Sequence, residues 1–155
     1  MISKKKITYL KSDNEIELIK VDPENNKHCE ILYEFLKKRE FKISHKKLPV
    51  FSTHKNFIKK NRYRKWFLIV HKNNFIGSIY ILYDNGIGLD IESINYHLID
   101  NILKIIFMNI NPLKAIPSMR IDKFHININP TNNSFKEIIE KLGAKLQQQT
   151  YIFNR

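Results

Sequence analysis

Residues 65–91, KWFLIVHKNNFIGSIYILYDNGIGLDI, carry the clearest structural signal in the chain. The apolar run at 65–70 is typical of a buried strand, and residues 72–74 suit a turn. Residues 75–83 return as a partner strand. Asn85-Gly86 then suits a second tight turn, because both residues accept a positive φ angle. This stretch predicts three antiparallel strands joined as a meander.

One strand and two helices are expected before the meander. Residues 15–21 alternate roughly between polar and apolar side chains and stop at Asp22-Pro23, which predicts a strand. In residues 27–39 the apolar side chains recur at three- and four-residue spacing, as on one face of a helix. Residues 40–51 predict a loop, after which Ser52 or Thr53 can cap a second helix.

The part after the meander is expected to complete a layered domain. The predicted elements are a long apolar helix over 95–108, an irregular segment over 112–122, a strand over 123–129, a short helix from Ser134 to Leu142, and a closing strand over 145–153. Gly143 stands where a helix end often needs a positive φ angle. This order predicts an α/β (α+β) fold with a mixed, mostly antiparallel sheet flanked by helices.

Length and composition favour a single domain over residues 1–155. Only 4 glycines and 5 prolines occur, so no linker or low-complexity stretch divides the chain. Cys29 is the single cysteine, which excludes an internal disulfide and favours a reducing compartment, the cytoplasm. The basic N-terminus lacks the apolar run of a signal peptide or membrane span. No histidine, carboxylate or cysteine spacing predicts a metal site.

The charge balance raises the question of anionic partners. The chain has 27 Lys and Arg against 15 Asp and Glu, a formal net charge of +12. The basic residues are spread from Lys4 to Arg155 and form no run with interleaved aromatics. We therefore do not expect a specific nucleic-acid partner, which would need a contiguous positive face. A phosphate-rich small ligand would use the same surplus.

Two segments carry a family resemblance. Residues 66–70 with Phe75-Ile76-Gly77-Ser78-Ile79 resemble a strand pair whose second strand opens with a "y-i-G-s-i" pattern. Residues 129–134, NPTNNS, continued by 140–144, EKLGA, resemble an "N-P-x-N … E-K-L-G-F" signature. Both patterns, and the element order, resemble the GNAT superfamily of acyl-CoA-dependent N-acetyltransferases over residues 15–153.

The resemblance implies acetyl-CoA as co-substrate and a place for it. In the family the fourth and fifth strands splay, and pantetheine pairs with the exposed edge of the fourth, here Leu89, Asp90 and Ile91. The pyrophosphate rests at the start of the following helix. The residues implied for the cofactor are Leu89, Ile91, Ser93, Asn95, Tyr96, His97, Asn129 and Asn132. The alternative for His97 is an exposed helix position without a role. The alternative for Asn129 and Asn132 is turn chemistry alone.

The resemblance also implies catalytic and acceptor residues. Asp90 and Glu92 lie at the strand end within reach of an acceptor amine, as candidate bases; a solvated turn is the alternative. His45 and His54 fall in the region that shapes the acceptor pocket in the family, although surface histidines are common. The implied reaction acetylates a primary amine of a small molecule, with an amino sugar as a candidate, and a homodimer stays open.

Two departures from the family pattern support a rival function. The family places a Q/R-x-x-G-x-G/A loop before the helix, but no glycine occurs here between Gly88 and Gly143, and Glu92 and Asp100 lie near the phosphate position. Many members carry a tyrosine as general acid where this chain has Ile139. The alternative function is a catalytically degenerate GNAT-fold binding or assembly module.

Overall fold

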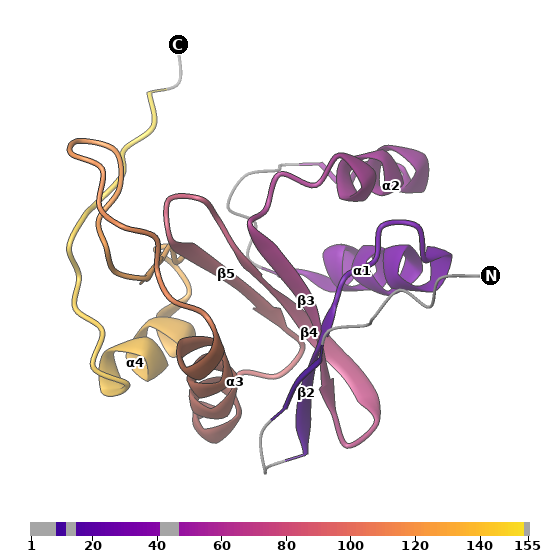
Figure 1. The fold of residues 1–155 in the computed structure, drawn as a ribbon, viewed down its shortest axis with the longest axis horizontal. Coiled ribbons are helices and arrows are strands. Elements are labelled where there is room, and N and C mark those ends of the chain that lie inside the picture. The colour runs from indigo at the N-terminus through magenta and orange to yellow at the C-terminus, as the bar shows by residue number, and fades with distance from the viewer. Residues whose placement is uncertain (1–8, 12–14, 41–46, 154–155) are drawn as a thin grey trace.

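A six-stranded sheet with helices on both faces forms the protein, whose computed structural model describes residues 9–11, 15–40 and 47–153 (Figure 1). The strands follow the order β1-β2-β3-β4-β5-β6, and only the β5–β6 pair is parallel. The strands are β1 (Tyr9–Lys11), β2 (Ile16–Lys20), β3 (Lys65–His71), β4 (Asn74–Ile81), β5 (Gly86–Ile91) and β6 (His125–Ile126). The helices are α1 (Asn26–Lys38), α2 (Phe51–Lys60), α3 (Tyr96–Asn109) and α4 (Asn133–Lys141).

The helices divide between the two faces of the sheet. Figure 1 shows α1 and α2 on one side and α3 and α4 on the other. Because side chains alternate along a strand, Phe67 and Ile69 of β3 pack toward α3, whereas Trp66 and Leu68 pack toward α1 and α2. The sequence prediction of a mixed, mostly antiparallel α/β fold is confirmed.

Both predicted turns of the meander form, but the second one lies one residue earlier than expected: Gly86 takes no positive φ angle and is the first residue of β5. Lys72 and Asn73 take φ angles of 48° and 65°, and Asn85 takes 71°. The Asn85 side chain is fully buried. It accepts a hydrogen bond from the Leu113 N–H and donates to the carbonyls of Leu113 and Ile121. This one side chain therefore ties the β4–β5 turn to both ends of the irregular loop that precedes β6.

Both predicted N-caps are wrong. α2 begins at Phe51 with Val50 as its N-cap, so Ser52 and Thr53 lie inside its first turn. Phe51, the first residue of α2, packs edge-on against Tyr33. α4 is capped by Asn132, whose Oδ1 accepts from the Phe135 N–H at 3.2 Å, and not by Ser134.

The C-terminal strands also differ from the prediction. Instead of 123–129, β6 covers two residues, since it pairs with β5 only at Gly86↔His125 and Ile87↔Ile126 before the two strands diverge. Residues 145–153 form no strand. β1, which the sequence pattern did not indicate, pairs with β2. The φ angle of Gly143 is +93°, as predicted for the end of α4.

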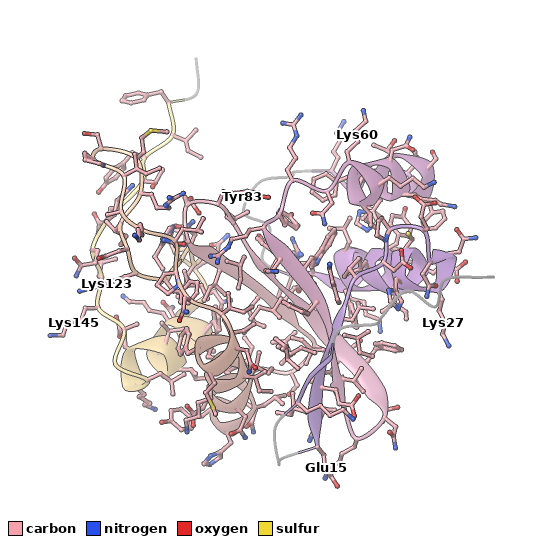
Figure 2. All side chains as sticks on the ribbon, in the orientation of Figure 1. Glu15, Lys27, Lys60, Tyr83, Lys123 and Lys145 are labelled. Carbon is pink, nitrogen blue, oxygen red and sulfur yellow. The ribbon has the colours of Figure 1, made fainter. Side chains whose placement is uncertain are left out.

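No helix in the described part of the chain combines the length and apolar character that a membrane crossing needs. The lysines lie on opposite sides of the molecule: Figure 2 shows Lys27 and Lys60 at one side and Lys123 and Lys145 at the other.

Candidate functional site

The sheet opens beside the second half of β5. β5 pairs with β4 from Gly77↔Ile91 to Ile81↔Ile87, along nearly its whole length. On its other side the pairing with β6 ends at Ile87. Within the described residues, no strand pairs with Leu89–Ile91 on the side away from β4.

The direction of the β5 backbone follows from its hydrogen bonds to β4. The Gly86 carbonyl accepts from the Leu82 N–H at 2.8 Å, and the Glu92 N–H donates to the Ile76 carbonyl at 3.0 Å. In an antiparallel ladder alternate residues face the partner strand. Leu89 and Ile91 therefore direct their backbone N–H and C=O groups toward the open side, as expected of a splayed edge.

Both candidate bases are held in ion pairs with the end of α1. Asp90 Oδ2 accepts from Arg39 Nε at 2.9 Å and from Arg39 Nη2 at 2.7 Å. Glu92 Oε1 accepts from Lys38 Nζ at 2.8 Å, and this hydrogen bond raises the pKa of Lys38. The Asp90 side chain is only 18% exposed, against 41% for Glu92. Asp90 is therefore the shielded carboxylate, and Glu92 is the solvated one.

An aromatic cluster lies beside the Asp90–Arg39 pair on the α1 face of the sheet. Tyr63 and Tyr80 stack with ring centroids 4.2 Å apart and an interplanar angle of 8°. Burial raises the pKa of Tyr63 to about 12 and also raises the pKa of Tyr80, so both phenols stay protonated near neutral pH. A Cβ atom at Gly88 would meet the Tyr80 ring at 1.9 Å, so glycine is required there.

His54 lies inside this cluster and is 7% exposed, so the alternative of a common surface histidine is wrong. Its ring lies 5.5 Å from Tyr33 and 6.4 Å from Phe57 between centroids. Burial, followed by the nearby Arg39 guanidinium, lowers the pKa of His54. Its Nε2 has no hydrogen-bond partner among the described residues. His45, the other predicted acceptor residue, lies outside the described residues.

The start of α3 is capped by Asn95, whose Oδ1 accepts from the Leu98 N–H at 3.1 Å. Ser93, Tyr96 and His97 are exposed around it. The two carboxylates near the predicted phosphate position are both paired: Glu92 with Lys38, and Asp100 with Lys104 at 2.6 Å. Their negative charge is therefore offset locally.

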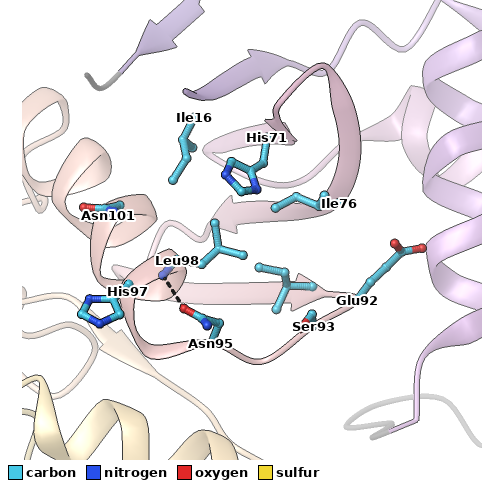
Figure 3. A pocket seen from close by; sticks show the side chains of 10 residues that line it. Ile16, His71, Ile76, Glu92, Ser93, Asn95, His97, Leu98 and Asn101 are labelled. Carbon is cyan, nitrogen blue, oxygen red and sulfur yellow. Dashed lines mark hydrogen bonds between the residues drawn. The ribbon is translucent and has the colours of Figure 1, made fainter. Parts of the chain in front are cut away.

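A groove of about 470 Å³ lies between the first turn of α3 and the nearby strand ends (Figure 3). Its size falls within the roughly 300–1,000 Å³ of small-molecule sites. It brings together five predicted site residues: Ile91, Glu92, Ser93, Asn95 and His97. The sequence did not indicate its other lining residues, which are Ile16, His71, Ile76, Leu98 and Asn101. Ile16 and His71 come together because β2 pairs with β3 at this position. No local sequence pattern indicates that pairing.

Asn129 and Asn132 do not line this groove. Asn129 Oδ1 accepts from the N–H and hydroxyl of Thr131, at 3.0 and 2.8 Å, and Asn132 caps α4. These contacts agree with the turn-chemistry alternative. Ile139 is buried in the core against α3, at the position where many GNAT members carry a tyrosine.

Among the described residues, no group of three or more His, Cys, Asp or Glu side chains lies close enough together to bind a metal ion. Cys29 is fully buried, and its burial raises the pKa of the thiol. Neither observation adds a residue to the site.

Comparison with solved structures relates this architecture to a known one. The chain is similar to the crystal structure of a possible acetyltransferase from Clostridium difficile 630, with a TM-score of 0.53 and 15% sequence identity. The match covers 90% of this chain and 97% of that one. At the level of sequence, no family model and no curated protein matches the chain. The structural likeness supports the GNAT-like fold expected from the sequence.

Proposed function

We propose that the chain is an N-acetyltransferase that moves an acetyl group from acetyl-CoA to a primary amine of a small molecule. The observation that carries the proposal is the divergence of β5 from β6 after Ile87, which leaves Leu89 and Ile91 facing an open edge. An extended amide chain such as pantetheine can pair with an edge of this kind. The fold likeness to a possible acetyltransferase supports the same function.

In this proposal the start of α3 receives the pyrophosphate. The first N–H groups of a helix lack intrahelical acceptors, and the helix dipole favours an anion there. Asn95 occupies the Leu98 N–H, which leaves the N–H groups of Tyr96 and His97 in the first turn. Ser93 and the His97 side chain supply further donors. The Lys38 and Lys104 pairs offset the two nearby carboxylates.

The proposed chemistry uses the two carboxylates at the end of β5. The amine nitrogen forms the new C–N bond as the C–S bond of the thioester breaks, and the amine must lose a proton. Asp90 is the better placed acceptor for that proton, because Arg39 fixes its orientation on the α1 face. Glu92 is the second candidate. His54 and His45 belong to the acceptor side, where an amino sugar is a candidate substrate.

A catalytically degenerate binding or assembly module is the second candidate function. The specific observation that favours it is the burial of Ile139 in the core, where a family general acid would stand. The loop from Glu92 to Asn95, which lacks glycine, also keeps side chains between the backbone and a phosphate. Such a protein would bind acetyl-CoA weakly or not at all.

Thermal unfolding with and without acetyl-CoA tests the proposal. A ligand at a hundredfold excess over its Kd adds about 2.7 kcal/mol of stability. No shift at millimolar acetyl-CoA would exclude the enzyme and favour the degenerate module. Binding without acetylation of any primary amine would also favour the module.

Three variants test whether the pyrophosphate binds at the start of α3. Asn95→Ala and Asn25→Ala each remove an N-cap, of α3 and α1, at a cost of about 1 kcal/mol. Only Asn95→Ala should also reduce the shift caused by acetyl-CoA, and His97→Ala should reduce it without the cap loss. Equal shifts in all three variants would show that the phosphates bind elsewhere.

A further inference from the structure

The loop between α3 and β6 presents aliphatic side chains to solvent. Ile116 and Arg120 form an isolated β-bridge that closes a tight turn, in which Ser118 takes a φ angle of 61°. Met119 in this turn is 77% exposed, and Ile121 just after it is 53% exposed. Neither belongs to the core clusters on the two faces of the sheet. The tip of the loop therefore carries aliphatic surface that does not stabilise the core.

Hydrogen bonds hold the loop in this orientation. The buried Asn85 side chain bonds to the backbone at both ends of the loop, at Leu113 and Ile121. Arg120 bonds across the middle, where Nε donates to the Lys114 carbonyl at 2.9 Å and Nη1 donates to the Tyr83 carbonyl at 2.8 Å. Because the backbone is fixed at these points, the aliphatic side chains of the tip stay at the surface.

Two further segments lie beside this loop at the same end of the sheet. Arg64 Nη2 donates to the Asn111 carbonyl at 2.9 Å, which joins the start of the loop to the connection between α2 and β3. Lys65 pairs with Ile81, so the β4–β5 turn follows directly at that end. Figure 2 shows Tyr83 of this turn at the upper border of the molecule, as it does the Lys60 side chain.

The sheet end, as we call residues 60–65, 82–85 and 111–123, is strongly basic. It contains two carboxylates, Asp84 and Asp122, against seven Lys and Arg residues, which are Lys60, Arg62, Arg64, Lys65, Lys114, Arg120 and Lys123. None of the seven forms an ion pair with a carboxylate in the described part of the chain. Folding therefore gathers, from three separate segments, a positive surface that no run in the sequence indicates.

We propose that the sheet end docks on an anionic lipid surface, with the tip of the loop entering the headgroup region. Such a surface presents negative charge at its headgroups and hydrocarbon directly beneath them. A matching protein surface has aliphatic side chains at its tip and basic side chains around it, as Met119 and Ile121 are placed among the lysines here. Contact of this kind needs no membrane-crossing helix. It is independent of the proposed acetyl transfer.

The exposed side chains favour lipid over the other anionic or apolar partners. The bases of a single-stranded nucleic acid stack on aromatic rings, whereas Met119 and Ile121 offer no planar face. Tyr83, which is 62% exposed, suits the headgroup level, where tyrosine is enriched. A second copy of the chain would bring an equally basic sheet end to this one, and the two would repel each other.

Co-sedimentation of the full chain with vesicles tests the docking. We expect binding to vesicles of phosphatidylglycerol and phosphatidylcholine, weaker binding at high salt, and little binding to phosphatidylcholine alone. Lys123→Gln should weaken the binding about fivefold. Lys27→Gln, on the opposite side of Figure 2, is the matched control and should bind like the unaltered chain. No binding to the anionic vesicles, or equal losses in the two variants, would overturn the proposal.

Insertion of the tip is tested separately from charge. Met119→Ser keeps the charge and should weaken vesicle binding about tenfold, because it removes the apolar surface that enters the lipid. Val50→Ser, at a 65% exposed position at the start of α2, should change it little. The fluorescence of Met119→Trp should shift to shorter wavelength on anionic vesicles, and that of Val50→Trp should not. Unchanged binding of Met119→Ser, or an unshifted Met119→Trp spectrum, would contradict insertion.

A single-stranded oligonucleotide separates the remaining rival. Position 119 is exposed, so circular dichroism and thermal unfolding should show that its variants fold like the unaltered chain. We expect the oligonucleotide to bind more weakly than the anionic vesicles and without dependence on Met119. Strong oligonucleotide binding that Lys123→Gln weakens, in a chain that does not bind vesicles, would overturn the proposal and assign the sheet end to nucleic acid.

Discussion

The two faces of the sheet are covered by different chemistry. On one face α3 and α4 pack against the strands through apolar side chains, among which Ile102 is fully buried. On the other, α1 and α2 cover the Tyr63–Tyr80 stack, and α1 ends at Arg39, which pairs with Asp90. Both faces bury an apolar cluster, but only the second face also carries the shielded ion pair and the stacked phenols beside the end of β5.

The largest effect should come from the apolar face. Ile102→Ala removes a fully buried side chain and should lower the free energy of unfolding by about 2–5 kcal/mol. Met108→Ala, on the same helix at an 84% exposed position, should change it little. Urea denaturation measures both. Similar losses in the two variants would mean that α3 packs in another orientation.

The ion pair on the other face should give a smaller change in stability. Asp90→Asn leaves the partly buried Arg39 guanidinium without its carboxylate and should cost about 1–3 kcal/mol. Glu92→Gln removes the more exposed pair and should have little effect on unfolding. If Asp90 is also the base, its variant should lose acetylation even where acetyl-CoA still binds. Equal stabilities for the two variants would contradict the difference in shielding.

His54 should make the stability depend on pH in one direction. Its folded-state pKa lies below the ordinary 6.5, so the unfolded chain takes up this proton first as the pH falls. The stabilisation that His54 contributes is full above pH 6.5 and is lost as the pH falls below that value. His28, whose pKa burial also lowers, acts in the same direction. The free energy of unfolding, measured by urea denaturation, should therefore differ less between about pH 7.5 and about pH 5 for His54→Phe than for the unaltered chain. An unchanged difference would show that His54 is not held neutral.

The parts of the fold that were predictable are those with local causes. The meander over 65–91 forms as expected, because its turns and apolar runs are neighbours in sequence. The predicted strand over 123–129 is only two residues long in the structure, because its length depends on how far β5 and β6 stay paired, and these strands lie 39 residues apart in sequence at Gly86↔His125. Residues 145–153 have the sequence of a strand but form none, because a strand also needs a partner.

The candidate site divides in the same way. The sequence placed Asp90 and Glu92 at the end of a strand and Asn95 at the start of a helix, and the structure has them there. It did not indicate Arg39 and Lys38, because these lie 51 and 54 residues from their partners. His71 likewise joins the groove only through the register of β2 and β3.

The open edge of β5 can be tested residue by residue by following backbone amide signals by NMR during titration with acetyl-CoA. The amides of Leu89 and Ile91 face the open side and should shift strongly and gain protection from hydrogen exchange. The amides of Gly88 and Asp90 face β4 and should be protected already, with smaller shifts. An alternating response over residues 88–91 is the predicted result. Shifts confined to other parts of the chain, or no shift at saturating acetyl-CoA, would contradict the proposed cofactor edge.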